Sequence, residues 1–310
     1  MPDVRICEMA PRDGVQAVNS ERIVPPATKV KLIEAIAAAR PAYIEVGSFV
    51  SLRAVLQMAD TLEVCRLLKK VEGTEYAALV ANLKYYESFK QAGLHSVAVM
   101  ASASEAYCQF NVRKSIAEAT AEAGELIRTA SRDGYRVRAH LSAAFHDIDG
   151  TEANIDTVVD LTHRLLEFGC ECVALADTKG TADPRCVRRV LLAMESATGL
   201  ERIGVHFHDS FGTGIANALA AYECGVRTFD ASVAAVGGTP FSRRPKGPGG
   251  GGNIATEELV YMFNGMGIST GVRYDALLEA GEIVEKILAD AGDPPSTSKI
   301  LTRRRNAAAR

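Results

Sequence analysis

The fold is indicated most clearly by the stretch CVALADTKGTADPRCVRRVLLAMESATGLERIGVHFH, which covers residues 172–208. It opens with a short apolar run, residues 172–176, of the kind found in buried β-strands. Asp183 then precedes a proline, an arrangement that suits the first turn of a helix over residues 183–196. A second strand is predicted at residues 204–208. Strand, helix and strand in this order predict two parallel strands joined by a right-handed crossover.

The same alternation of strand-like and helical patterns extends along the chain. The predicted strands are residues 4–7, 43–46, 76–80, 96–100, 136–140, 172–176, 204–208 and 228–232. Further helical patterns cover residues 26–39, 116–131, 154–168 and 214–223. Eight such units fit a closed (β/α)8 TIM barrel, an α/β fold that needs about 250 residues. An open doubly wound sheet is the alternative, although no GxGxxG motif follows the first strand to support its dinucleotide-binding form.

Two more helical patterns follow the eighth strand, at residues 254–267 and 272–291. The first supplies the eighth helix of a barrel, and the second lies beyond it. We therefore expect a barrel domain over residues 1–270 and a C-terminal helical extension with a tail over residues 271–310. The three consecutive arginines at residues 303–305 are expected to belong to a solvated, frayed tail.

Composition excludes several classes of protein. The 310 residues are 47% hydrophobic and 24% charged, with a net charge of −3, which argues against binding to nucleic acid or to a membrane surface. No apolar run approaches the roughly 18 residues of a membrane span, and a strand-like stretch begins too early for a signal peptide. The seven cysteines contain no CxxC pair, which favours reduced thiols in a cytoplasmic protein.

In a (β/α)8 barrel, the active site lies at the carboxyl ends of the strands. The polar residues expected there are Glu8, Arg12, Asp13, Glu45, Asn82, Asp177, Thr178, His206, His208 and Asp209. This set is rich in groups that bind metals or transfer protons.

His206 and His208 form the sharpest motif. Residues i and i+2 of a strand point to the same face, so both imidazoles can reach one ion. With one carboxylate they would leave open positions on a catalytic Mg²⁺, Mn²⁺ or Zn²⁺. The alternative is one packed and one solvated histidine, but the position at a strand end, followed by Asp209 and Gly212, favours a site.

Arg12 and Asp13 lie in a turn just after the first predicted strand. The aspartate could hold a cation while the arginine stabilises an oxyanion on a bound carbonyl group. An ordinary Asp-Gly turn with an exposed arginine is the alternative.

A glycine-rich segment at residues 237–253 follows the eighth strand. It is interpreted as a lid over the site or as a phosphate cradle. Within it, Arg243, Arg244 and Lys246 could contact the phosphates of a carrier such as CoA. Solvated charges on a surface loop are the alternative.

Together these motifs resemble the 3-hydroxy-3-methylglutaryl-CoA lyase family, a group of metal-dependent barrel lyases that act through an enolate. The resemblance covers nearly the whole chain. It rests on residues 8–16, 44–51, 176–180, 205–209 and 252–257.

The resemblance implies a retro-Claisen cleavage of a 3-hydroxyacyl-CoA to acetyl-CoA and a keto acid. A divalent metal, Mg²⁺ or Mn²⁺ with Zn²⁺ as a further option, would polarise the hydroxyl group and the forming ketone. Its implied ligands are Asp13, His206, His208 and Asn253. Arg12 would stabilise the enolate oxygen of the thioester. The polar positions implied to line or support the site are Glu8, Gln16, Glu45, Asp177 and Glu257.

The chain departs from this family in three places. Thr239 stands where the lyases carry a cysteine that takes part in proton transfer, and a hydroxyl is a far poorer general acid than a thiol. The loop is about five residues longer than the family's, through residues 243–248, and Ala-Val replaces Asn-Glu at residues 17–18. Candidates for the replacement acid are His140, Glu45 and water.

Three functions are therefore compared. The first is a lyase of the same reaction type, acting on 3-hydroxy-3-methylglutaryl-CoA or on a citramalyl-CoA-like or longer 3-hydroxyacyl-CoA. The second is a metal-dependent aldolase or Claisen synthase acting on a 2-keto acid. The third is a non-catalytic protein that binds metal or CoA. We expect an acyl-CoA substrate, no nucleic-acid or membrane partner, and a homo-oligomer, either a dimer or a tetramer.

Overall fold

The structure of the protein, a computed structural model, describes residues 2–19, 21–51, 55–238 and 252–308. Four of the expected site residues, Thr239, Arg243, Arg244 and Lys246, lie outside the described residues.

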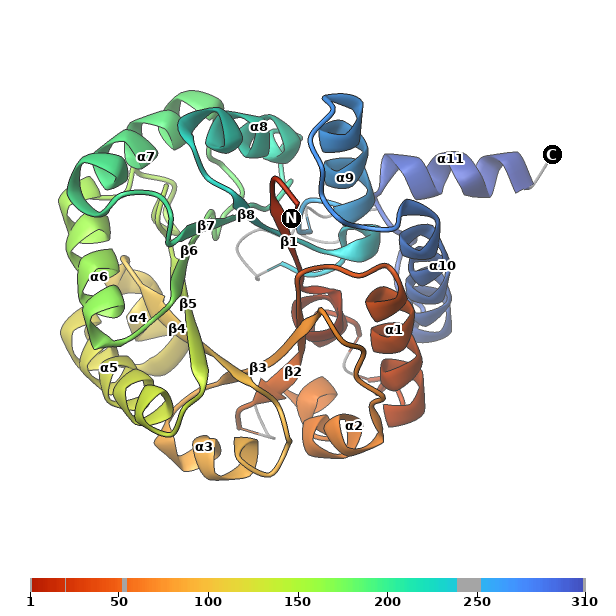
Figure 1. Cartoon of the computed structure of the whole chain (residues 1–310), viewed down its shortest axis with the longest axis horizontal. Coiled ribbons are helices and arrows are strands. Elements are labelled where there is room, and N and C mark those ends of the chain that lie inside the picture. Colours follow the sequence, from red (N-terminus) through yellow and green to blue (C-terminus); the bar gives the residue numbers. More distant parts are fainter. Residues whose placement is uncertain (1, 20, 52–54, 239–251, 309–310) are drawn as a thin grey trace.

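Eight parallel strands close into a barrel in sequence order (Figure 1). They are β1 (Arg5–Glu8), β2 (Tyr43–Phe49), β3 (Glu75–Val80), β4 (Ser96–Ser102), β5 (Arg136–Ser142), β6 (Cys172–Ala176), β7 (Ile203–His206) and β8 (Thr228–Ala231). The barrel closes because β1 pairs with β8 as well as with β2. The predicted TIM barrel is confirmed, and the open doubly wound sheet is wrong.

Helices surround the strands (Figure 1). They are α1 (Pro26–Ala38), α2 (Thr61–Leu67), α3 (Leu83–Phe89), α4 (Glu105–Val112), α5 (Ile116–Arg132), α6 (Ile155–Phe168), α7 (Pro184–Thr198), α8 (Gly214–Cys224) and α9 (Thr256–Gly265). Local caps explain several boundaries. The Asp183 carboxylate accepts hydrogen bonds from the amides of Arg185 (2.7 Å) and Cys186 (2.9 Å) and so begins α7 as predicted. The patterns did not single out α2, α3 and α4, which are too short for a helical period to stand out.

One strand boundary affects the site. The sequence pattern placed His208 in the seventh strand, but β7 ends at His206. His208 instead forms an isolated antiparallel bridge with Asn253, supported by a hydrogen bond of 3.1 Å from the amide of Ile254 to the carbonyl of Phe207. The end of the glycine-rich segment therefore lies directly beside the histidine pair.

Two more helices extend the chain beyond the barrel helices, α10 (Tyr274–Ala291) and α11 (Lys299–Ala308). Helix α10 packs against α1, and α11 projects beside α9 and α10 (Figure 1). The expectation of a frayed tail at residues 303–305 is wrong. These arginines lie within α11, where Arg304 pairs with Glu282 at 2.9 Å and Arg305 pairs with Glu285.

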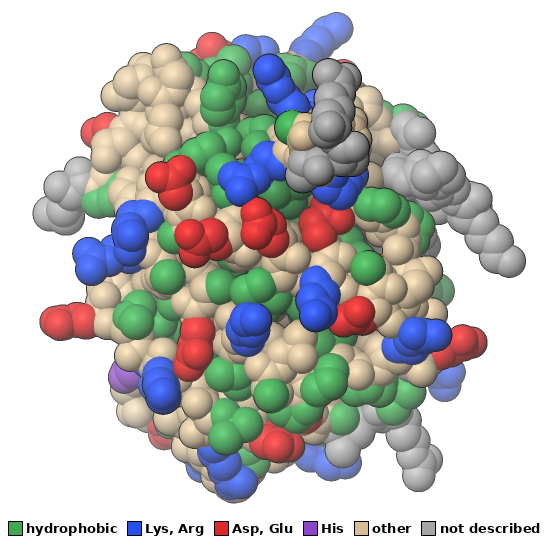
Figure 2. Space-filling model, turned by 90° about the vertical axis from the view of Figure 1, so that its right-hand side faces the viewer, with side chains coloured by type: hydrophobic (Ala, Val, Ile, Leu, Met, Phe, Trp, Pro, Cys, Tyr) green, Lys and Arg blue, Asp and Glu red, His purple; other side chains and the backbone are tan. Residues whose placement is uncertain are grey.

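The surface carries both signs of charge. Figure 2 shows acidic and basic side chains interspersed over the side of the molecule that faces the viewer. Within the described part of the chain, no helix has both the length and the apolar character needed to cross a membrane.

Candidate active site

The residues expected to bind a metal come from separate elements at the carboxyl ends of the strands. Asp13 lies in a π-helical turn, Ala10–Gly14, that begins two residues after β1. His206 is the last residue of β7, and His208 follows in the bridge to Asn253. One potential ligand atom from each of Asp13, His206 and His208 lies within 4.8 Å of the other two. The structure therefore brings the expected ligand set together.

Hydrogen bonds orient both imidazoles. The Nδ1 atom of His208 lies 2.7 Å from the backbone oxygen of Asp177. A carbonyl oxygen only accepts, so Nδ1 donates and Nε2 of the neutral ring keeps a lone pair. The Nδ1 atom of His206 lies 3.1 Å from Oδ2 of Asp230. Outer partners of this kind fix the tautomer and orientation of histidines that bind metals.

His208 is set up to remain neutral. Burial, followed by the neighbouring His206, lowers the pKa of His208 to about 4. Its Nε2 atom is buried and has no hydrogen-bond partner among the described residues. A neutral imidazole with an unused, buried lone pair has the properties of a metal ligand.

Asp13 and Asn253 form the other half of the candidate metal centre. Oδ2 of Asp13 accepts hydrogen bonds from Nδ2 of Asn253 (2.7 Å) and from the amide of Gly238 (3.0 Å). Nδ2 of Asn253 also donates to the carbonyl of Val236 at 3.0 Å, whereas its Oδ1 is buried with no partner in the described part of the chain. Buried polar atoms are normally paired. A carboxylate beside an unpaired amide oxygen and an unpaired imidazole nitrogen therefore fits a divalent cation.

Arg12 is clamped between two carboxylates. Its Nε atom pairs with Glu45, and its Nη1 atom lies 2.7 Å from Oδ1 of Asp13. Burial alone would raise the pKa of both carboxyl groups, but the charge of Arg12 holds each pKa below its ordinary value. The guanidinium is thus fixed beside the candidate metal centre, as an oxyanion-stabilising group must be.

Glu8 and Glu257 bind backbone groups around the loop that follows β8. Glu8 accepts from the amide of Val233 (3.0 Å) and from the hydroxyl of Thr256 (2.6 Å), and Glu257 accepts from the amide of Ala234 (3.2 Å). Burial raises the pKa of each carboxyl group to about 7. Both side chains support the site by holding this loop.

Asp177 also acts on the backbone. Its carboxylate accepts hydrogen bonds from the amides of Gly180, Thr181 and Ala182, at 3.0 to 3.2 Å. Burial raises its pKa to about 6. The carboxylate shapes the turn after β6, and the carbonyl of the same residue orients His208.

Gln16 is not brought into this cluster. Its side chain is exposed and has no hydrogen bond to another described residue. It lies in the helical turn after the π-helical segment, Ala10–Gly14.

Two buried charged residues near the site, Arg138 and Asp230, were not expected from the sequence. Arg138 on β5 pairs with Asp230 on β8, and its guanidinium lies 5.1 Å from the ring centroid of Tyr43. The available signal was the occurrence of charged residues in otherwise apolar strands, because such side chains are seldom buried unless they are paired. The sequence could not indicate which strands would supply the partners.

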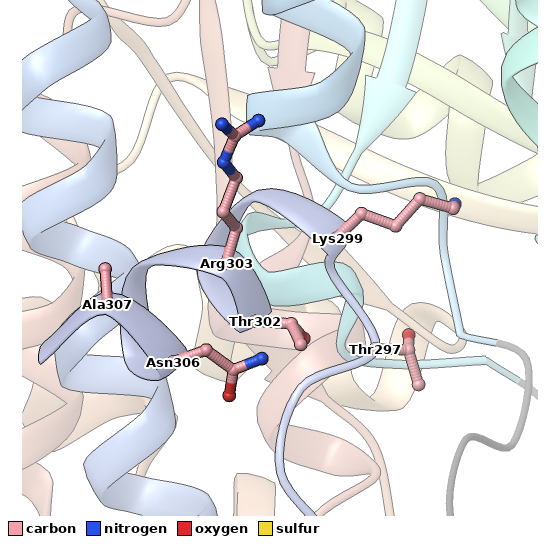
Figure 3. A pocket seen from close by; sticks show the side chains of 6 residues that line it. All are labelled: Thr297, Lys299, Thr302, Arg303, Asn306 and Ala307. Carbon is pink, nitrogen blue, oxygen red and sulfur yellow. The ribbon is translucent and has the colours of Figure 1, made fainter. Parts of the chain in front are cut away.

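A cavity of about 690 Å³ lies along α11, away from the four expected metal ligands. Figure 3 shows its described lining, Thr297, Lys299, Thr302, Arg303, Asn306 and Ala307. None of these side chains is a carboxylate or an imidazole, so they lack the donor set of a metal centre.

Comparison with known proteins connects this geometry to a family. The HMGL-like family model matches residues 3–284. A 3-hydroxy-3-isohexenylglutaryl-CoA/hydroxymethylglutaryl-CoA lyase of Pseudomonas aeruginosa is 35% identical over 97% of this chain and 98% of its own length. A hydroxymethylglutaryl-CoA lyase of Pseudomonas mevalonii is 38% identical over 94% of both chains.

A solved structure of a similar protein has the same fold. An HMG-CoA lyase from Acinetobacter baumannii, in complex with coenzyme A and 3-methylmalate, superposes with a TM-score of 0.86 and 30% identity. The match covers 96% of this chain and 94% of that one. With the family model matching most of its length and close relatives aligned end to end, this chain belongs to the HMGL-like family.

Proposed function

We propose that the protein is a carbon–carbon lyase that cleaves a 3-hydroxyacyl-CoA, of the 3-hydroxy-3-methylglutaryl-CoA type, to acetyl-CoA and a keto acid. One observation carries the proposal. In a chain of this family, the unpaired atoms His208 Nε2 and Asn253 Oδ1 lie beside the Asp13 carboxylate. Together with His206, these residues would hold one divalent metal, Mg²⁺ or Mn²⁺ with Zn²⁺ as a further option. The bound ion would polarise the 3-hydroxyl group and the forming ketone.

The chain itself supplies stabilisation of the enolate. A base takes the proton of the 3-hydroxyl group, the oxygen forms the carbonyl of the keto acid as the C–C bond breaks, and the electron pair of that bond moves onto the thioester as an enolate. Arg12 is held by Glu45 and Asp13, so its guanidinium is pre-oriented toward charge that develops at the thioester oxygen. The enolate then takes up a proton to give acetyl-CoA.

Two observations bear on the acyl group of the substrate: the names of similar proteins and the presence of Thr239. The Pseudomonas aeruginosa relative is named for an isohexenylglutaryl as well as a methylglutaryl substrate. Thr239 in place of the family's cysteine favours an altered proton donor, which is compatible with an acyl group other than methylglutaryl. We propose Arg243, Arg244 and Lys246 as contacts of the CoA phosphates.

The test is a turnover assay with purified protein, Mg²⁺ or Mn²⁺, and a panel of 3-hydroxyacyl-CoAs that differ at C3. We expect acetyl-CoA from at least one of them, with loss of activity after chelation and in a His208→Ala variant. No acetyl-CoA from any member would refute the proposal. Turnover of a free 2-keto acid without CoA would indicate an aldolase or synthase, and tight metal or CoA binding without any turnover would indicate a non-catalytic binder.

We also propose that the protein acts in the cytoplasm as a homo-oligomer, a dimer or a tetramer. All seven cysteines are in the described residues and are free thiols, which supports a reducing compartment. Light scattering on the purified protein tests the oligomeric state.

A further inference from the structure

His140 lies inside the barrel, between two carboxylates. Its Nε2 atom is 2.8 Å from Oε1 of Glu45, and its Nδ1 atom is 3.6 Å from Oδ2 of Asp230. Its ring stands edge-on to that of His206, with 6.0 Å between the centroids. The side chain is 6% exposed, and both carboxylates are fully buried. The imidazole therefore contacts both carboxylates in a largely buried position.

The two carboxylates serve different parts of the site. Glu45 holds Arg12, the residue proposed to stabilise the enolate. Asp230 holds Nδ1 of His206, a proposed metal ligand. His140 hydrogen-bonds Glu45 and packs against Asp230, so a chain of side chains in contact leads from Arg12 through Glu45, His140 and Asp230 to His206.

We propose that His140 is a positioning residue that fixes Arg12 and His206 relative to each other. This inference rests on the proposed function, because it takes Arg12 and His206 in the roles given there. A carboxylate only accepts hydrogen bonds, so the shorter contact requires Nε2 of His140 to donate to Glu45. The Nδ1 atom approaches Oδ2 of Asp230 only to 3.6 Å, beyond hydrogen-bond distance, so His140 packs against this carboxylate.

The same residues do not form a second metal centre. His140, His206 and Asp230 could also share an ion on distance alone. However, Arg138 pairs with Oδ1 of Asp230, and Oδ2 is already beside His206. A divalent cation there would face a buried guanidinium across one carboxylate, and this repulsion would be strong in a low-dielectric interior. The charges therefore favour Asp230 as the partner of Arg138 and His206, with His140 packed against it.

The test compares His140→Phe with His140→Gln, and uses His163→Phe as a control. His163 lies on the outer face of α6 and is mostly exposed. Three quantities are measured: kcat and KM for the best substrate, Mn²⁺ affinity by calorimetry, and the ¹⁵N signals of His206 in labelled protein without metal. The NMR signals report the tautomer of His206 and depend on neither metal nor turnover.

For His140→Phe we expect kcat to fall about 100-fold and Mn²⁺ binding to weaken about 10-fold, the range found for outer partners of metal ligands. KM should change much less than kcat. The signals of His206 should shift toward a mixture of tautomers. His140→Gln can still donate to Glu45 and should recover part of kcat, while His163→Phe should match the wild type.

A folded His140→Phe protein with kcat, Mn²⁺ affinity and His206 signals close to the wild type would overturn the inference. If His140→Phe does not fold, the test rests on His140→Gln. The inference is then overturned if this variant has the kcat, the Mn²⁺ affinity and the His206 tautomer of the wild type. Two bound Mn²⁺ ions per wild-type chain would also contradict it. A wild type without turnover would refute the proposed function, but the affinity and NMR measurements would still test the role of His140.

Discussion

The role of each polar residue in the site depends on which of its oxygen and nitrogen atoms already have hydrogen-bond partners. The carboxylates of Glu8, Asp177 and Glu257 accept hydrogen bonds from backbone amides, and Glu8 also accepts from the hydroxyl of Thr256. These contacts stabilise the loops of the site. Among the described residues, His208 Nε2 and Asn253 Oδ1 are buried and have no hydrogen-bond partner. Leaving such an atom without a partner costs about 1–3 kcal/mol. A bound cation would remove that cost.

Arg12→Lys tests the guanidinium clamp. A lysine offers one point of charge and cannot bridge Glu45 and Asp13 with a planar fork. We expect kcat to fall about 100-fold or more, as for the loss of one oxyanion donor, with a smaller change in KM. Steady-state kinetics with the best CoA substrate measure both constants. A lysine variant that keeps kcat within threefold would contradict a role for Arg12 in stabilising the enolate.

At the scale of elements, the loop stem after β8 (residues 232–238) decides how the ligands are presented. Ala234, Ala235 and Gly237 all have positive φ, at 62°, 55° and 115°. For alanine this backbone is unfavourable by roughly 1–2 kcal/mol per residue. It persists because Glu8 and Glu257 hold the adjacent amides. In this strained stem, the amide of Gly238 donates a hydrogen bond to Asp13, and the carbonyl of Val236 accepts one from Asn253.

Gly237→Ala tests the fit of the stem against the ligands. An added Cβ would collide with Nδ2 of Asn253 and lie 2.6 Å from Oδ2 of Asp13. We expect Mn²⁺ affinity, measured by calorimetry, to fall by at least tenfold. Gly134→Ala is the matched control, because Gly134 also has a positive φ (86°) but open space around it. Equal Mn²⁺ affinities for the two variants would count against the contact.

Glu257→Gln tests the buried carboxyl group. Burial raises its pKa to about 7 from an ordinary value of 4.5. Between these values the folded protein binds more protons than the unfolded chain, so the free energy of unfolding falls as the pH rises from about 4.5 to about 7. The glutamine cannot ionise. Between pH 5 and pH 8, the free energy of unfolding of the Glu257→Gln variant should therefore fall less than that of the wild type. The difference should be about 1.4 kcal/mol for each pH unit by which folding raises the pKa of Glu257.

Urea unfolding at the two pH values measures this difference. Glu282→Gln is the control, because the Glu282 side chain is 64% exposed and pairs with Arg304 at the surface. Parallel pH profiles for wild type and Glu257→Gln would show that the carboxyl group does not titrate between the folded and unfolded states as expected.

At the scale of the whole molecule, the C-terminal segment returns to the catalytic face. The hydroxyl of Ser296 donates to the carbonyl of Ala234 at 2.7 Å, and Leu301 is buried against α10. We therefore propose that the extension, residues 271–310, braces the barrel domain of residues 1–270 at the loop stem.

Removing residues 296–310 should lower Tm by a few degrees through the lost burial and hydrogen bond. It should also lower kcat by about tenfold, since small misplacements of catalytic groups are costly. Thermal unfolding and kinetics measure the two effects. The double variant Arg304→Ala, Arg305→Ala removes only the outer ion pairs, which contribute about 0–1 kcal/mol each, and should retain kcat. An active truncated protein would refute the bracing role.

Much of this molecule could be predicted because the relevant signals are local. The apolar run at residues 172–176 and the cap at Asp183 depend on neighbouring residues alone. The position of Asp13, His206 and His208 followed from one topological rule, that parallel strands present their carboxyl ends at one face. Helix α11 was not predicted, because its position depends on Leu301 and on ion pairs with α10.

The sequence by itself determined the eight strand–helix units and the ligand types at the strand ends, because periodicity and capping act over a few residues. Only the tertiary structure decided that Arg138 and His140 on β5 meet Asp230 on β8, and that the strained stem after β8 holds Asp13 and Asn253. Strand alternation cannot distinguish the barrel interior from the face under the helices. The partners of a buried charge are chosen by closure of the barrel, which brings together residues far apart in the chain.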